Sequence, residues 1–254
     1  MGYKRVIKDI GSKFGYDIKS KNNQKNNMKF DEIDTEIINS VIPYTKTSPE
    51  RIAALIESVN YVIKNEISGS IVECGVWKGG SIMAVAKKLL SLRCRDKHLY
   101  LFDTFSGMTK PTDADISHLE TSASKQFEKL KIDNNSSNWL NVSIDEVKKV
   151  VFSTGYDKEK IHFIKGKVED TLPLHTPDEI SILRLDTDWY ESTKHELIHL
   201  FPHLSTGGVL IIDDYGHWKG SKKAVDEYIS ENNIPILLNR IDYTARIGVK
   251  IRSN

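Results

Sequence analysis

Residues 70–92 read SIVECGVWKGGSIMAVAKKLLSL, and this stretch decides the fold. Its first part, 70–75, is a short apolar run that ends at Gly75, where the missing side chain permits a tight turn. From 79 to 92 the apolar residues recur at the three- and four-residue spacing of an amphipathic helix. The stretch therefore predicts a buried strand, a glycine turn and a helix, which is the opening unit of a layered α/β sheet.

The same alternation continues toward the C-terminus. Apolar strands that alternate with helices predict a mostly parallel sheet with helices on both faces. The tail, 235–251, reads as two strands joined by a turn, and strands without a crossover helix between them pair antiparallel. We expect further strands at 98–105, 160–168, 180–188 and 207–215, and helices at 119–131, 143–153, about 190–201 and 219–232.

The segment before the first strand has a different pattern. Apolar residues at helical spacing predict two amphipathic helices, one across 33–41 and one across 52–59. Residues 1–30 hold eight Lys or Arg and two Asp or Glu. They form either a basic arm that contacts an anionic glycan or lipid, or a solvated leader without a partner. We therefore expect a basic arm and helical lid at 1–65 and an α/β domain at 66–254.

The composition narrows the class of protein. Lys and Arg total 36 and Asp and Glu total 35, so no net charge attracts the chain to nucleic acid or a membrane. The sequence has no apolar run near the roughly 20 residues of a membrane span, and its first ten residues do not resemble a signal peptide. Cys74 and Cys94 suggest neither a disulfide framework nor a zinc site. We expect a soluble, cytoplasmic protein.

Functional residues are expected where the parallel strands end. In an open α/β sheet, ligands bind outside the carboxyl ends of the strands. Carboxylates recur at these ends, and buried carboxylates are costly unless they are paired, hydrogen-bonded or metal-bound. Their accumulation along one edge of the sheet predicts a shared site. The five strand ends are Glu73–Gly75, Asp103–Phe105, Gly166–Glu169, Asp186–Asp188 and Asp213–Tyr215.

The first two strand ends favour a nucleoside cofactor. Gly79 and Gly80 allow a close backbone approach where the helix begins, but the loop does not match G-x-G-x-x-G, which argues against a dinucleotide. Glu73 suits a cofactor that carries a cationic amino group and no phosphate there. Asp103 is placed to accept hydrogen bonds from both ribose hydroxyls. The alternatives are a simple strand-to-helix turn and an Asp that caps its own loop.

The last two strand ends favour a divalent cation. Asp186 and Asp188 lie two residues apart, on one face of an extended segment, and Asp213 and Asp214 end the neighbouring strand. Such carboxylates repel one another unless a cation neutralises them, and Mg²⁺ prefers oxygen ligands. Alternatively, some of them cap helices or form salt bridges. His217 follows this cluster, although loop histidines are more often solvated.

Four of these stretches together resemble a known family. VECGVWKGGS (72–81), LFDTFSGM (101–108), LRLDTDWYEST (183–193) and GGVLIIDDYGHWKGSKKAVDEY (207–228) are similar to the macrocin O-methyltransferase family, whose members methylate sugar hydroxyls on macrolide and aminocoumarin antibiotics. The similarity runs from about Tyr44 to Lys250. It implies a class I methyltransferase fold, Rossmann-like, with a seven-stranded, mostly parallel sheet, an antiparallel last strand and an N-terminal helical lid.

The resemblance also implies residue roles. Asp186, Asp213 and Asp214 match the family's metal ligands, and Asp188 matches its proposed general base. YTKTSPER (44–51) resembles the lid motif YTMTSxxR, with Lys46 where Met is common. The residues expected to bind S-adenosylmethionine are Thr47, Ser48, Glu73, Gly75, Val76, Trp77, Gly79, Ser81, Asp103, Thr104, Phe105, Gly107, Gly166, Val168, Glu169 and Asp186.

The resulting hypothesis is an O-methyltransferase that depends on S-adenosylmethionine and Mg²⁺ or another divalent cation. It would act on a hydroxyl of a sugar or a glycosylated metabolite, so the acceptor is a small molecule or a glycan. We expect no nucleic-acid partner and no transmembrane segment. Homo-oligomers are compatible with the sequence. The alternative acceptor is a catechol or another phenol. Two other classes remain open, a nicotinamide-linked dehydrogenase and a non-catalytic interaction module that keeps only the fold.

Overall fold

The computed structural model describes residues 30–134 and 136–252. The chain divides into two compact units, Met1–Asp31 and Glu32–Asn254, and the sheet lies in the second. The predicted basic arm therefore lies outside the described residues, apart from residue 30.

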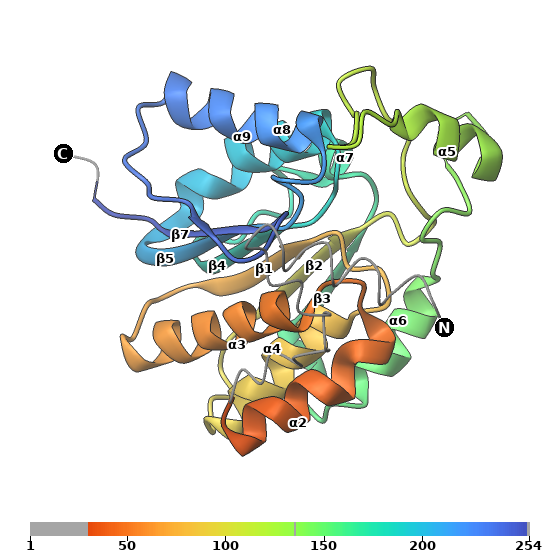
Figure 1. The fold of residues 1–254 in the computed structure, drawn as a ribbon. Coiled ribbons are helices and arrows are strands. Elements are labelled where there is room, and N and C mark those ends of the chain that lie inside the picture. Colours follow the sequence, from red (N-terminus) through yellow and green to blue (C-terminus); the bar gives the residue numbers. More distant parts are fainter. Residues whose placement is uncertain (1–29, 135, 253–254) are drawn as a thin grey trace, which may run out of the picture. The chain divides into compact units, whose positions relative to one another are not determined.

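A single sheet forms the centre of the described residues (Figure 1). Its seven strands have the order β3-β2-β1-β4-β5-β7-β6. The first five strands are parallel, whereas β7 runs antiparallel to both β5 and β6. The strands are β1 (Ser70–Cys74), β2 (Leu99–Asp103), β3 (Ile161–Lys165), β4 (Ile180–Leu185), β5 (Leu204–Ile212), β6 (Asn239–Arg240) and β7 (Arg246–Val249). This confirms the mostly parallel sheet and the hairpin at one edge.

Helices cover both faces of the sheet (Figure 1). Because strand side chains alternate between faces, Ile71 packs with the layer that contains α3, α4 and α6, and Val72 packs with the layer that contains α8 and α9. The helices are α2 (Glu32–Val41), α3 (Pro49–Lys64), α4 (Gly80–Ser91), α5 (Ala123–Leu130), α6 (Ile144–Phe152), α7 (Val168–Thr171), α8 (Tyr190–Leu200) and α9 (Lys219–Glu231), with 3₁₀ turns at Ile42–Tyr44, Lys158–Lys160 and Phe201–His203.

Some element boundaries differ from the sequence-based expectation. The strand expected at 160–168 ends at Lys165, because Gly166 turns the chain with φ +147° and α7 begins two residues later. The helix expected from 119 begins at Ala123, where the Ser122 hydroxyl accepts a hydrogen bond from the backbone N–H of Ser124. The strand expected from Gly207 begins at Leu204.

The two N-terminal helices pack against the sheet domain. Leu55 and Val59 of α3 share one hydrophobic cluster with Leu89 of α4. The buried ion pair between Lys88 Nζ and Asp34 Oδ1, at 2.6 Å, joins α4 to α2. These contacts place both helices in the same compact unit as the sheet. A functional division of the chain at residue 65, with a lid before it, stays a prediction.

The long connection between β2 and α6 is fixed at Asp115. This fully buried carboxylate accepts hydrogen bonds from the backbone N–H of Thr112 at 2.7 Å and of Tyr190, the first residue of α8, at 2.8 Å. Ser117 then forms a backbone bridge with Trp218, just before α9. The connection is thereby held over the carboxyl ends of β4 and β5.

Among residues 30–134 and 136–252, no helix has the length and apolar character needed to cross a membrane.

Candidate active site

A cavity of about 410 Å³ lies at the carboxyl ends of the central strands. Its lining comes from the start of α3, the loops after β1 to β5, and the β2–α6 connection. Most residues predicted from the sequence meet here. They are Thr47, Gly75, Val76, Trp77, Ser81, Asp103, Thr104, Gly107, Gly166, Val168, Glu169, Asp186, Asp188, Asp213 and Asp214.

Four predicted cofactor residues are not part of the cavity lining within the described residues. Ser48 is the N-cap of α3, and Gly79 is the left-handed N-cap of α4. Glu73 is buried beneath the cavity, where it pairs with Arg184. Phe105 belongs to the hydrophobic core. Their proposed contact with a cofactor stays a prediction, and the structure gives each of them a local structural role.

The glycine loop packs closely against the loop after β4. Gly75 has φ +84°, and a Cβ atom there would lie 2.0 Å from the backbone oxygen of Asp186. The Asp103 carboxylate accepts hydrogen bonds from the N–H groups of Val76 at 2.7 Å and Trp77 at 3.0 Å. Asp103 therefore fixes the glycine loop through Oδ2, and its Oδ1 accepts a hydrogen bond from the backbone N–H of Phe105 at 2.7 Å.

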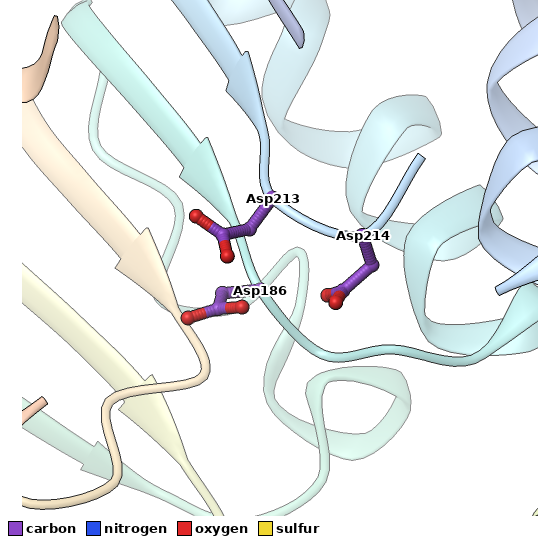
Figure 2. Close-up of side chains that lie close together, drawn as sticks. All are labelled: Asp186, Asp213 and Asp214. Atoms are coloured by element: carbon purple, nitrogen blue, oxygen red, sulfur yellow. The ribbon is translucent and has the colours of Figure 1, made fainter. Parts of the chain in front are cut away.

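The acidic cluster consists of Asp186, Asp213 and Asp214 (Figure 2). One ligand oxygen from each carboxylate lies within 4.8 Å of the others, and the three residues follow β4 and β5. Burial is the largest cause that raises the pKa values of Asp186 and Asp214. Asp214 Oδ2 is buried without a hydrogen-bond partner among the described residues. Oxygen donors with an orphaned buried atom are what a hard divalent cation requires, so the residues fit Mg²⁺.

Arginine side chains partly neutralise this cluster. Nη2 of Arg184 lies 2.8 Å from Asp186 Oδ2 and 2.7 Å from Asp213 Oδ1, and its Nη1 lies 2.5 Å from Glu73. Burial nevertheless raises the pKa of Glu73 to about 7. A second arginine, Arg51, pairs with the other oxygen of Asp213. The site therefore combines several carboxylates with two guanidinium groups.

Asp188 faces the same cavity in a constrained geometry. Its backbone has φ +70°, which is uncommon for a residue other than glycine. The indole N–H of Trp218 donates to Asp188 Oδ1 at 2.6 Å. Burial, and then the charge of Asp186, raise the pKa of Asp188 to about 8, although the bond from Trp218 opposes the shift. Asp188 is thus an oriented carboxyl group that titrates near neutral pH, as a general base requires.

Three tryptophans pack together beside Asp188. The ring centroids of Trp189 and Trp218 lie 5.0 Å apart, and those of Trp139 and Trp189 lie 5.6 Å apart, all in edge-to-face contact. Trp139 and Trp218 line the cavity, whereas Trp189 is buried behind them.

The sequence does not mark every residue of the cavity as a site residue. Trp139, Tyr243 and Arg51 line it, and so does His217, the loop histidine that follows the acidic cluster. Trp139 and Tyr243 come from segments far apart in the chain, and no local pattern marks them. Arg184 lies below the site, and a charged residue inside the apolar run ISILRL was a signal of its pairing with buried carboxylates.

The fold and the site define a class I methyltransferase. Among the described residues, the sheet has seven strands, and its last strand, β7, runs antiparallel between β5 and β6. The cavity lies at the carboxyl ends of the parallel strands. The family model for macrocin-O-methyltransferase (TylF) matches residues 4–248. The chain belongs to the macrocin O-methyltransferase family, and it is therefore an O-methyltransferase.

Individual relatives agree with this family. The chain is 32% identical over 199 residues to the demethyldecarbamoylnovobiocin O-methyltransferase of Streptomyces niveus, across 78% of this chain and 72% of that protein. It is 28% identical over 201 residues to the mycinamicin III 3''-O-methyltransferase of Micromonospora griseorubida, across 79% and 76%. The solved structure of the O-methyltransferase NovP superposes with a TM-score of 0.72 at 30% identity, across 82% of this chain and 83% of that one.

Proposed function

We propose that this protein transfers a methyl group from S-adenosylmethionine to a hydroxyl of a sugar or a glycosylated metabolite, with the help of Mg²⁺ or a similar cation. One observation carries the proposal. A single cavity brings together the glycine loop at Gly75, the carboxylate of Asp103, the acidic cluster and Asp188. A nucleoside site and a cation site that share one space suit a transfer reaction between a cofactor and a bound hydroxyl.

The cofactor would lie along the glycine loop. The Gly75–Trp77 backbone would hold its methionine part, because Gly75 permits a close approach. Asp103 would accept the ribose hydroxyls, and Val168 with Glu169 would line the adenine. S-adenosylmethionine supplies an electrophilic methyl group on a sulfonium. The chain's own contribution is to hold that methyl in line with the acceptor oxygen.

The acidic cluster would hold the cation. Asp186, Asp213 and Asp214 would each offer a carboxylate oxygen, with Asp214 Oδ2 already free of hydrogen bonds within the described residues. A cation bound there supplies an electrophile that lowers the pKa of a coordinated hydroxyl. Two adjacent sugar hydroxyls would then be oriented next to Asp188.

Asp188 would accept the proton of the reacting hydroxyl. The acceptor oxygen would bond to the methyl carbon as the bond from that carbon to sulfur breaks, with S-adenosylhomocysteine as the leaving group and the hydroxyl proton taken by Asp188. Trp218, which donates to Asp188 Oδ1, would keep the carboxylate turned toward the cavity.

The acceptor is inferred to be a sugar. The relatives described above are named as O-methyltransferases of demethyldecarbamoylnovobiocin and of the 3'' position of mycinamicin III. Trp139 and Trp218 line the cavity and would offer apolar surface to the face of a sugar ring. The cytoplasmic location and the oligomeric state stay predictions.

Binding of S-adenosylhomocysteine tests the cofactor assignment. We expect isothermal titration calorimetry to show one site per chain for S-adenosylhomocysteine and none for NADH. Gly75→Ala should weaken this binding by at least about tenfold, because the new Cβ would collide with the backbone oxygen of Asp186.

Gly155→Ala is the matched control. Gly155 also has a positive φ, +79°, but a Cβ there would meet nothing within 4 Å. Circular dichroism would confirm that both variants are folded. NADH binding would support a dehydrogenase, and a folded wild-type protein that binds neither compound would favour a non-catalytic module.

A further inference from the structure

Arg51 connects the start of α3 to the acidic cluster. Its Nη1 pairs with Asp213 Oδ2, and its Nε lies 3.0 Å from Asp242 Oδ2 in the turn between β6 and β7. Ser48 supports this arrangement, because its hydroxyl also donates to Asp242, at 3.1 Å. Arg51 lines the cavity and is therefore on the side from which a ligand of the acidic cluster arrives.

Arg184 occupies a different position. It lies one residue before the end of β4, its side chain is only 4% exposed, and it is not part of the cavity lining. It binds Glu73, Asp186 and Asp213 together from beneath. Arg184 is therefore a permanent counter-charge within the sheet, and a cation that enters from the cavity does not meet it first.

Asp213 has no oxygen left free of the arginines. Arg184 Nη2 holds Oδ1, and Arg51 holds Oδ2. The Thr47 hydroxyl lies 3.2 Å and 3.3 Å from the same two atoms. A divalent cation shared by Asp186, Asp213 and Asp214 would need an Asp213 oxygen, and the guanidinium of Arg51, which lines the cavity, already pairs with Oδ2.

We propose that Arg51 competes with the divalent cation for Asp213, and thereby sets the cation affinity of the site. The proposal rests on the cation assigned under the proposed function. Asp242 makes the exchange inexpensive, because Arg51 keeps this second carboxylate partner when it leaves Asp213. Cation binding is thereby coupled to the start of α3, where Thr47 also contacts Asp213.

The test is calorimetric titration of the whole protein with MnCl₂ alone at one pH. Arg51→Gln removes the competing charge, and we expect it to tighten Mn²⁺ binding by about tenfold, within the usual range of coupling between two ligands. Asp242→Asn keeps the side-chain shape but leaves Arg51 with Asp213 as its carboxylate partner. It should weaken Mn²⁺ binding severalfold.

A double-mutant cycle separates competition from general electrostatics. If Asp242 acts through Arg51, Asp242→Asn should have little effect once Arg51 is Gln. Arg95→Gln is the charge-matched control, since Arg95 is exposed and lies before β2, at the amino ends of the parallel strands. It should leave the Mn²⁺ affinity unchanged.

Two results would overturn the proposal: unchanged or weaker Mn²⁺ binding in folded Arg51→Gln, or an equal effect of Asp242→Asn in both backgrounds. Because Asp242→Asn is read independently, the proposal stays testable if Arg51→Gln does not fold. Absence of Mn²⁺ binding in wild type and every folded variant is a distinct outcome, which would refute the cation assignment itself.

Discussion

Replacing Asp188 with Asn is expected to lower the rate constant of methyl transfer by about 10²- to 10⁴-fold, the usual contribution of general base catalysis. Asn keeps the shape of the side chain and can still face Trp218, but it cannot accept the hydroxyl proton. The affinity for S-adenosylhomocysteine should stay within about twofold of wild type, because the change removes a proton acceptor and not a cofactor contact. Single-turnover kinetics and calorimetry measure the two quantities separately.

The pH dependence gives this prediction a second readout. Burial and the charge of Asp186 raise the pKa of Asp188 to about 8. Only the deprotonated form accepts a proton, so the wild-type rate should rise with pH through this range, and a bound cation should shift the rise to lower pH. Asp188→Asn should lack this rise.

Asp178→Asn is the control for the Asp188 experiment, because Asp178 is exposed and precedes β4, at the amino ends of the parallel strands. Full activity of folded Asp188→Asn would remove Asp188 from the role of base.

Replacing Asp214 with Asn should abolish cation-dependent activity. Asp214 Oδ2 is a buried oxygen of the acidic cluster that has no hydrogen-bond partner among the described residues, so we expect it to be the donor most available to a cation. We expect Mn²⁺ affinity to fall by at least about 100-fold, beyond the upper end of the effects seen when only the supporting partners of metal ligands are changed. Calorimetry with MnCl₂ measures this loss, and circular dichroism checks the fold.

A matched change on α9 provides the comparison for Asp214. Asp226 is exposed and pairs with Lys222 on the same helix, so Asp226→Asn alters the same charge at the surface. It should bind Mn²⁺ as wild type does. Unreduced Mn²⁺ affinity in Asp214→Asn would exclude Asp214 as a ligand and leave the acidic cluster without its proposed role.

The parallel strands could be predicted, in their order along the chain, because local sequence patterns determine them. Apolar runs that end in Gly75, Asp103, Asp186 and Asp213 mark strands whose carboxyl ends meet at one edge of a parallel sheet. The tail without a crossover helix gave the antiparallel hairpin. The carboxylates of the site could therefore be predicted from the sequence, since their position depends on the strand ends alone.

The partners of these carboxylates could not be predicted in the same way. Arg51 reaches Asp213 across 162 positions of the chain, so no local spacing indicates the pair. Asp115 fixes a long connection to the start of α8, and that contact also depends on tertiary packing. The backbone N–H groups of Val76 and Trp77 bind Asp103, an interaction that only the folded loop produces.

Short elements and contacts between distant side chains could not be predicted from the sequence either. Helix α7 has four residues, too few for a helical period to be visible. The contact among Trp139, Trp189 and Trp218 joins three separate segments, and only the folded structure shows that these rings pack on one another.

The most direct measurement follows the methyl group. The purified protein is incubated with methyl-labelled S-adenosylmethionine and a panel of nucleotide sugars, glycosides and catechols, in the presence of either Mg²⁺ or EDTA. We expect label to appear in the methyl ether of a sugar hydroxyl with Mg²⁺ and to be absent with EDTA. Label on catechols alone, or transfer that EDTA does not reduce, would contradict it.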